Sequence, residues 1–101
     1  VPAASAAAPV RPAARLVAAS VRRALQADAR AGSLYTLVLA DPPYARSADA
    51  LDTLARFLGP VLAPQAVVVV ESPARWDVRL PWRPVRVKVY GDTKVSVLLN
   101  A

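Results

Sequence analysis

The segment that most constrains the fold is a short apolar run that two prolines end abruptly. Leu34 to Ala40 holds only apolar residues, tyrosine and threonine, and Asp41-Pro42-Pro43-Tyr44 follows it directly. Such a run, bounded by turn residues, is typical of a strand that is covered on both faces in a parallel sheet. Because proline fixes φ and removes a backbone donor, the strand ends there. The sequence therefore predicts a central strand of an α/β fold, with Asp41 at its carboxyl end.

Asp41 and Tyr44 stand where an α/β fold places a ligand site. Ligands of open α/β sheets bind in the crevice beyond the carboxyl ends of the strands. The two prolines also leave carbonyls free to accept hydrogen bonds from a ligand. The alternative is a plain turn, in which Asp41 caps the loop and Tyr44 packs on the surface, because Asp-Pro commonly opens turns. These residues alone leave both interpretations open.

Length and composition indicate one domain without a membrane span. The chain has 101 residues, and although 55% are apolar, no apolar run approaches the roughly 18 residues that a bilayer requires. Residues 1–13 are rich in alanine and proline and lack the pattern of a signal peptide, so they are expected to be a lead-in or linker before a domain at 14–101. The chain contains no Met and begins with Val1, so it is expected to be a trimmed product or a piece of a longer protein.

The residue types that are absent exclude several kinds of site. The chain has no Cys and no His, so thiolate metal sites, thiol nucleophiles and His-based triads are excluded. Acid–base chemistry would fall to carboxylates or tyrosine, and the lack of Cys fits a reducing compartment. Thirteen Lys and Arg against seven Asp and Glu give a formal charge of +6. That balance favours a polyanionic partner such as nucleic acid, the alternative being a merely basic surface.

The elements before and after the central strand are predicted from their periodicity. Residues 14–20 are interpreted as a short strand and 21–31 as a helix stopped by Gly32, although one longer alanine-rich helix is also compatible. Ser47 can cap a second helix, which Gly59-Pro60 ends. Residues 66–70 form a second buried strand, and strand, helix, strand in this order predicts a right-handed βαβ unit. The second helix has an apolar face formed by Leu51, Leu54, Ala55, Leu58 and Leu62.

The last third of the chain predicts a loop and a hairpin. Residues 74–84 mix prolines and arginines with Trp76 and Trp82, whose rings are expected to pack on the protein more than to stack on bases. Residues 85–90 and 93–99 are rich in β-forming residues, and only Gly91-Asp92 separates them, which predicts a tight turn. Pairing residue 90 with residue 93 would place Arg86, Lys88 and Tyr90 on one face with Val95 and Val97.

Three motifs in order resemble a known enzyme family. They are the run from Tyr35 to Tyr44 with its Asp-Pro-Pro-Tyr end, the strand Val67 to Glu71, and Tyr90-Gly91-Asp92-Thr93. Together they resemble the bacterial small-subunit (16S) ribosomal RNA guanine-N2 methyltransferases, over about residues 14 to 99. Asp-Pro-Pro-Tyr is shared with many methyltransferases that act on amines of adenine or guanine. The resemblance implies a Rossmann-like fold, S-adenosylmethionine as cofactor, no metal, and a cytoplasmic protein acting on ribosomal RNA or the small ribosomal subunit.

The resemblance also implies roles for the residues of the Asp-Pro-Pro-Tyr motif. The Asp41 side chain and the Pro42 carbonyl would accept hydrogen bonds from the exocyclic amine of the base. These bonds would orient the nitrogen lone pair at the methyl carbon. Pro43 would hold the turn and Tyr44 would stack on the extruded base.

The chain departs from the family pattern in its cofactor site. Gly32, Gly59 and Gly91 are far apart, so the glycine-rich loop that binds the cofactor in this fold is absent from the sequence. Ser20 and Asp41 are the only candidates for cofactor contact. The sequence therefore resembles the C-terminal part of such an enzyme. The N-terminal half would be supplied by the same longer chain or by a partner chain.

The remaining predictions concern RNA and the alternatives to this function. Four arginines are expected near the carboxyl ends of the strands, where RNA could approach, although solvated surface positions are equally compatible. One alternative function keeps the motif but methylates the N6 amine of adenine in DNA or RNA. Another is a non-catalytic RNA-binding remnant without a cofactor site. The four candidates for RNA contact are Arg46, Arg75, Arg79 and Arg83.

Overall fold

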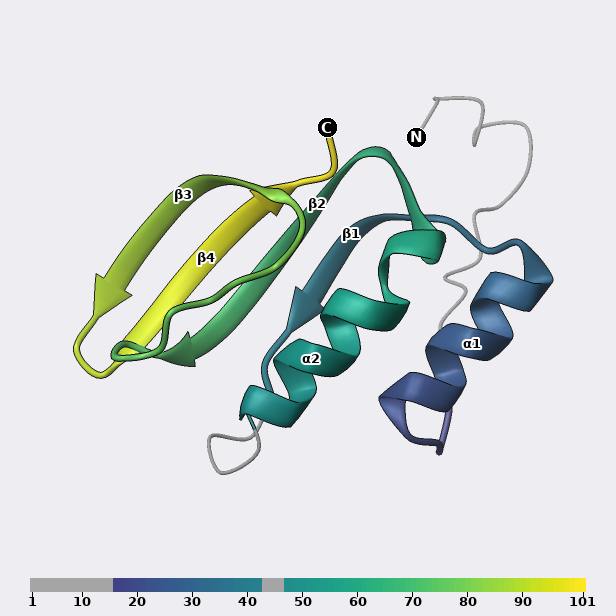
Figure 1. Ribbon diagram of the computed structural model, residues 1–101, viewed down its shortest axis with the longest axis horizontal. Helices are drawn as coiled ribbons and strands as arrows, with labels where there is room; N and C mark the ends of the chain where they lie inside the picture. The colour runs from purple at the N-terminus through teal and green to yellow at the C-terminus, as the bar shows by residue number, and fades with distance from the viewer. Residues whose placement is uncertain (1–15, 43–46) are drawn as a thin grey trace, which may run out of the picture.

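The computed structural model describes residues 16–42 and 47–101. Within them the sheet has four strands in the order β1-β2-β4-β3 (Figure 1). β1 and β2 are parallel, whereas β4 is antiparallel to both of its neighbours. The elements are α1 (Val21–Ala31), β1 (Tyr35–Ala40), α2 (Ser47–Phe57), the 3-10 turn η3 (Gly59–Val61), β2 (Leu62–Pro73), β3 (Arg83–Tyr90) and β4 (Thr93–Leu99).

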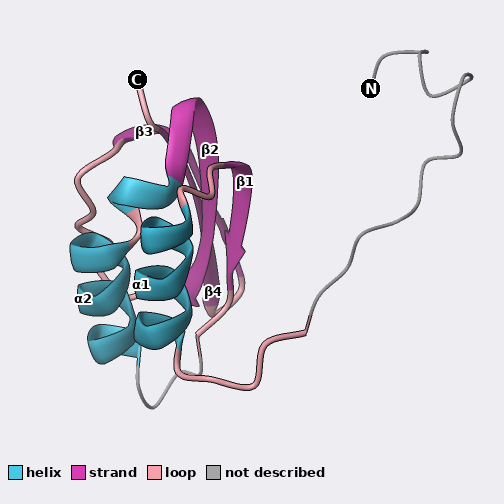
Figure 2. Ribbon diagram, turned by 90° about the vertical axis from the view of Figure 1, so that its right-hand side faces the viewer, coloured by secondary structure: helices cyan, strands magenta, loops and turns pink. Residues whose placement is uncertain are grey.

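The parallel unit predicted around the central motif is present as β1, α2 and β2. Both α1 and α2 lie on the same face of the sheet (Figure 2). Side chains three and four residues apart on α2 meet alternate side chains of β2, because the helix and strand periodicities bring these sets to one layer. The core between them is formed by Leu51, Leu54, Leu58, Val61, Leu62, Ala66, Val68, Val70, Trp82 and Leu98.

The ends of α1 follow local capping chemistry. The Ser20 hydroxyl accepts a hydrogen bond from the Arg23 backbone N–H at 3.2 Å, and Gly32 ends the helix in the left-handed region with φ 73°. The helix predicted at 21–31 is thus confirmed. The strand predicted at 14–20 is wrong for residues 16–20, which form no strand because they pair with none of the described strands.

The carboxyl-terminal hairpin has the predicted turn. Gly91 adopts φ 58°, and Tyr90 pairs with Thr93 across the two-residue turn. The same register places Arg86 opposite Val97 and Lys88 opposite Val95. Directly opposed residues share a face, so the predicted mixture of basic and apolar side chains on one face is confirmed.

The connection from β2 to β3 covers part of the sheet with its tryptophans. Trp82 is buried in the core and Trp76 packs against it, as expected for packing rather than for base stacking. The Lys94 ammonium donates to the Trp76 carbonyl. The Ala74 N–H donates to the Asp92 carbonyl at 2.7 Å, which fixes the start of this loop to the hairpin turn.

β1 lies at an edge of the described sheet, so the prediction of a central strand covered on both faces is wrong. Its Leu37 and Leu39 side chains are 57% and 73% exposed, because both helices lie on the other side. We call the uncovered side the open face. Its apolar part consists of Leu37 and Leu39 with the half-buried Val67, Val69, Val97 and Leu99, which the strand register places in rows.

β2 is longer than the predicted strand and is irregular near its start. Its pairing with β1 shifts between Leu62 and Val67, and Gln65 adopts a positive φ of 65°. The Gln65 N–H donates to the Asn100 carbonyl at 2.7 Å, and the Asn100 N–H donates to the Ala66 carbonyl at 2.9 Å. The residue after β4 thereby holds the irregular turn in place.

Candidate functional site

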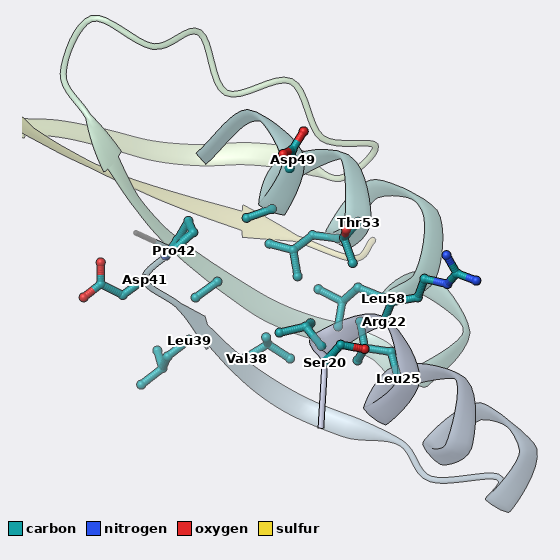
Figure 3. Close-up of a pocket in the computed structure, with 14 residues that line it drawn as sticks. Ser20, Arg22, Leu25, Val38, Leu39, Asp41, Pro42, Asp49, Thr53 and Leu58 are labelled. Carbon is teal, nitrogen blue, oxygen red and sulfur yellow. The ribbon is translucent and has the colours of Figure 1, made fainter. Parts of the chain in front are cut away.

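A pocket of about 710 Å³ opens at the carboxyl end of β1. It lies between this strand end and the two helices (Figure 3). Its walls are mostly apolar, with a few polar groups around them, as small-molecule sites usually are. The lining residues are Ser20, Val21, Arg22 and Leu25 from α1 and its cap, Val38 to Pro42 from the end of β1, and Asp49, Ala50, Thr53, Leu54 and Leu58 from α2 and the residue after it.

Asp41 and Pro42 form the strand-end border of this pocket. Pro42 is buried and Asp41 is exposed. Figure 3 shows the Asp41 side chain beyond the strand end and on the side of Leu39, whereas Val38 points toward the helices. The Asp41 carboxylate therefore projects at the rim of the pocket, on the open-face side. An acceptor at this position can reach a ligand that lies across the strand end.

Ser20 reaches the same pocket from α1. Its hydroxyl oxygen is occupied as the acceptor of the helix cap, but the hydroxyl proton remains available to donate. The two residues that the sequence offered for cofactor contact, Ser20 and Asp41, thus line one pocket. Both line it although twenty residues and the whole of α1 separate them along the chain.

Two polar residues of the pocket were not expected from the sequence. Asp49 and Thr53 come from α2 and line the pocket together, because residues four apart share one side of a helix. That spacing was the signal available in the sequence. Arg22 brings a positive charge, and its guanidinium lies 5.7 Å from the centre of the Phe57 ring. Two acidic residues and one arginine therefore line the pocket, although Figure 3 shows the Arg22 guanidinium directed away from Asp41.

The predicted RNA-contact arginines are separated by the fold. Arg75 follows the segment that is tied to the hairpin turn, and so lies at the Asp41 end of the sheet. Arg83 pairs with Leu99 at the opposite end, so its predicted place near the strand carboxyl ends is wrong. The polypeptide crosses the length of the sheet between these two positions.

Arg79 is an exposed residue whose charge has a local partner. Its Nε donates to the Asp77 carboxylate at 2.8 Å. That hydrogen bond and the charge of Asp77 raise the pKa of Arg79. Since the pair is exposed to water, it contributes little to folding, and it lowers the net positive charge that the loop offers to RNA.

Part of the sequence motif lies outside the described residues. Pro43, Tyr44 and Arg46 belong to the segment 43–46, so their roles remain predictions. Within the described chain, no group of three or more His, Cys, Asp or Glu residues could hold a metal ion. No helix in that part of the chain is long and apolar enough to cross a membrane.

The hairpin contributes candidate residues that sequence reasoning had not assigned to a function. Arg86, Lys88 and Tyr90 are exposed and lie on the open face of β3, as their pairing with β4 shows. The Lys88 ammonium lies 5.1 Å from the centre of the Tyr90 ring. Their spacing of two residues in a strand was the signal that could have identified them.

Comparison with known proteins gives a consistent result. The family model described as Conserved hypothetical protein 95 matches residues 5–99. No curated protein matches the sequence. Several solved structures resemble the fold, and three of them are informative here.

In each of the three structures about a quarter of the aligned residues are identical to those of this chain. A hypothetical protein of Thermus thermophilus has a TM-score of 0.68 and 25% identity, over 85% of this chain and 47% of that one. A candidate methyltransferase of Escherichia coli, yhhF, has a TM-score of 0.62 and 26% identity, over 84% and 46%. The rRNA methyltransferase aviRa of Streptomyces viridochromogenes has a TM-score of 0.60 and 26% identity, over 80% and 35%.

These likenesses confirm the predicted fold class. The chain has the α/β, Rossmann-like architecture of methyltransferases, and it includes the closing antiparallel hairpin of β3 and β4. It spans less than half the length of each of the three proteins.

Proposed function

Because the chain belongs to the Conserved hypothetical protein 95 family, we propose that it forms the base-binding part of a cytoplasmic, S-adenosylmethionine-dependent methyltransferase that modifies the N2 amine of a guanine in 16S ribosomal RNA. The observation that carries this proposal is the strand end, where Asp41 and Pro42 border a pocket in a methyltransferase fold. Support for an RNA substrate comes from the net charge of +6 and from the likeness to an rRNA methyltransferase.

The pocket fits part of the proposed cofactor. Its apolar wall of Leu25, Val38 and Leu54 suits a flat ring system, and the Asp41 and Asp49 carboxylates suit a positively charged sulfonium. Ser20 offers a hydroxyl donor in the same pocket. When bound, S-adenosylmethionine supplies an electrophilic methyl group. The chain lacks a glycine-rich loop of backbone donors, so we expect the remainder of the site to come from another segment.

Asp41 and Pro42 would position the amine of the base. The lone pair of an exocyclic amine is delocalised into the ring, which makes the nitrogen a poor nucleophile. The Asp41 carboxylate and the Pro42 carbonyl would each accept a hydrogen bond from this nitrogen and draw it toward tetrahedral geometry. Asp41 then acts by orientation and charge rather than as a strong base.

The open face suggests where the remainder of the enzyme would lie. Parallel strands normally have both faces covered, but here the Leu37 and Leu39 side chains are exposed and β1 has a free edge. The solved relatives have more than half of their length outside the matched part. We propose that the corresponding segment, in the same chain or in a partner chain, pairs with β1 and covers the apolar part of the open face.

The first test is a titration and transfer experiment on Asp41→Asn. Calorimetry would measure binding of S-adenosylmethionine, and tritium transfer would be measured on small ribosomal subunits. The substitution removes the charge and one acceptor at the strand end, so we expect transfer to fall about a hundredfold or more, with RNA binding unchanged. Asp52→Asn is the matched control, because Asp52 pairs with Arg56 on the exposed side of α2 at 3.1 Å and does not line the pocket.

The modified nucleoside distinguishes the alternatives. Mass spectrometry of digested RNA would show N2-methylguanosine if the proposal is correct, and N6-methyladenosine if the adenine alternative holds. RNA binding without cofactor binding or transfer would favour the non-catalytic RNA-binding alternative for this chain. Transfer that is insensitive to Asp41→Asn would contradict the assigned role of the strand end.

A further inference from the structure

The outer strand of the sheet carries a row of side chains that the proposed methyl transfer does not use. We call Arg86, Lys88 and Tyr90 the basic strip. All three are exposed and lie on the open face of β3, because they pair with Val97, Val95 and Thr93 of β4. In an extended strand, every second side chain points to the same side at intervals of about 7 Å. Two cations and one ring are therefore held in line on a regular scaffold.

The charges of the basic strip are not neutralised by neighbouring residues that the structure describes. Among these residues, neither Arg86 nor Lys88 has a carboxylate within ion-pair distance. The acidic residue in the same cross-strand row is Glu71 of β2. It is separated from Lys88 by Val95 of β4, which pairs with both. Asp92 stands in the turn past the end of the strand. The strip thus presents positive charge to solvent, next to an apolar surface.

Tyr90 gives the strip a feature that a merely basic surface would lack. The residue is 56% exposed, and the Lys88 ammonium lies 5.1 Å from the centre of its ring. An exposed aromatic ring beside a cation is the combination with which proteins bind single-stranded nucleic acids, since the ring stacks on a base and the cation contacts a phosphate.

The strip leads toward the candidate site. Tyr90 pairs with Thr93, and Thr93 pairs with Pro73 at the carboxyl end of β2. That is the end at which β1 reaches Asp41, since β1 and β2 are parallel. Three strand spacings separate β3 from β1, which is roughly 14 Å. A few nucleotides of extended RNA suffice to cover that distance.

We propose that the basic strip binds the single-stranded RNA segment that flanks the target nucleotide. Arg86 and Lys88 contact its phosphates, and Tyr90 stacks on one of its bases. The inference rests on the proposed function only for the nature of the substrate. It assigns RNA recognition to the face of the hairpin, whereas the sequence assigned it to arginines 46, 75, 79 and 83.

The test measures binding of a fluorescein-labelled single-stranded RNA of twelve nucleotides by anisotropy, across a range of salt concentrations and without cofactor. The double variant Arg86→Gln/Lys88→Gln removes two phosphate contacts. We expect about tenfold weaker binding near 100 mM salt, and a salt-dependence slope lower by about 1.4, since each contact to a single strand contributes about 0.7.

The matched control is Arg23→Gln/Arg30→Gln. It removes the same net charge from α1, on the other face of the sheet, and is expected to change the binding much less. Circular dichroism would verify that both double variants keep the fold. Equal losses in the two double variants would show that binding follows net charge alone and would overturn the proposal.

Tyr90 is tested separately from the charges. Tyr90→Leu keeps an apolar side chain but cannot stack, so we expect about tenfold weaker binding to the single strand. Tyr90→Phe keeps the ring and should bind like the unaltered chain. If Tyr90→Leu has no effect, or if a duplex of the same length binds as tightly as the single strand, the proposed recognition of unpaired bases is wrong.

Failure of this inference can be distinguished from failure of the proposed function. The two failures differ in their readouts: Arg86→Gln/Lys88→Gln should weaken binding of the twelve-nucleotide RNA without cofactor, whereas Asp41→Asn, at the residue assigned to the target base, should act chiefly on methyl transfer. If the chain binds RNA through the basic strip but transfers no methyl group, the proposed function is wrong and the RNA-binding proposal stands. Strip-dependent binding to vesicles with phosphatidylserine, without binding to RNA, would overturn the RNA assignment.

Discussion

At the residue scale, Ser20 combines a structural role with a place in the candidate site. Its hydroxyl caps α1 and lines the pocket that Asp41 borders. Helix caps are local features, since they depend on a few residues in sequence. The position of this cap beside the strand end depends on the packing of α1 against the remainder of the fold.

We predict that Ser20→Ala lowers the free energy of unfolding by about 1 kcal/mol, because the Arg23 N–H loses its acceptor. Urea denaturation would measure this change. Ser20→Asn is the control, since asparagine caps helices as well as serine does, and it should retain most of the stability. An equal loss of unfolding free energy in both variants would show that the serine stabilises the fold through its contacts in the pocket and not through the helix cap.

At the element scale, α2 packs on the sheet through one apolar side, and only one face of β1 is covered. Leu58, directly after α2, is 1% exposed, whereas Leu39 of β1 is 73% exposed. The same residue type thus occupies a filled core and an open surface in neighbouring parts of the fold. Comparing Leu58 with Leu39 therefore separates the contribution of packing to the free energy of unfolding from that of the residue type.

We predict that Leu58→Ala lowers the free energy of unfolding by about 3 kcal/mol, because it leaves a cavity in the core. Leu39→Ala should change it by less than about 0.5 kcal/mol. Urea denaturation of both variants at low protein concentration would measure the difference. A similar cost for Leu39→Ala would mean that the open face is covered in solution.

The outcome for these elements shows what the sequence could predict. The hairpin of β3 and β4 was predicted correctly because its turn residues, Gly91-Asp92, act locally. The run in β1 was correctly identified as a strand, but its place in the sheet was not. The apolar sequence of a strand shows that its faces are suited to burial. It does not show which segment of the protein buries them. Residues 16–20 were misassigned for a related reason, because strand formation requires a partner strand.

The candidate site shows the same division. Asp41 and Pro42 could be placed at a strand end from the sequence, because the prolines follow the apolar run directly. Asp49 and Thr53 could be assigned to a helix, but not to the pocket, since that depends on how α2 lies on the sheet. Arg83 was misplaced because the loop before it crosses the sheet to the opposite end.

At the scale of the whole molecule, the open face has two parts of different chemistry. Its apolar part extends from β1 to β4, and the basic strip follows β3 at the opposite edge. The first part requires cover by protein and the second remains suited to a polyanion. The two proposed partners would therefore lie side by side on one face without competing for it.

We predict that this chain alone binds the dye ANS under native conditions and self-associates as its concentration rises, because an extended apolar surface is exposed. Fluorescence titration and sedimentation velocity would measure the two effects. Leu37→Gln/Leu39→Gln should lower both, since it makes the exposed edge strand polar. Unchanged dye binding in that variant would place the exposed apolar surface elsewhere.

The strand order also has a consequence for the time course of folding. β4 is synthesised after β3, yet it lies between β3 and β2. Until β4 has emerged from the ribosome, β2 has no partner on that side and β3 has none at all. A delay after β3 has emerged and before β4 has emerged would leave β3 unpaired and one edge of β2 open, and exposed strand edges are a condition under which nascent chains recruit chaperones or aggregate.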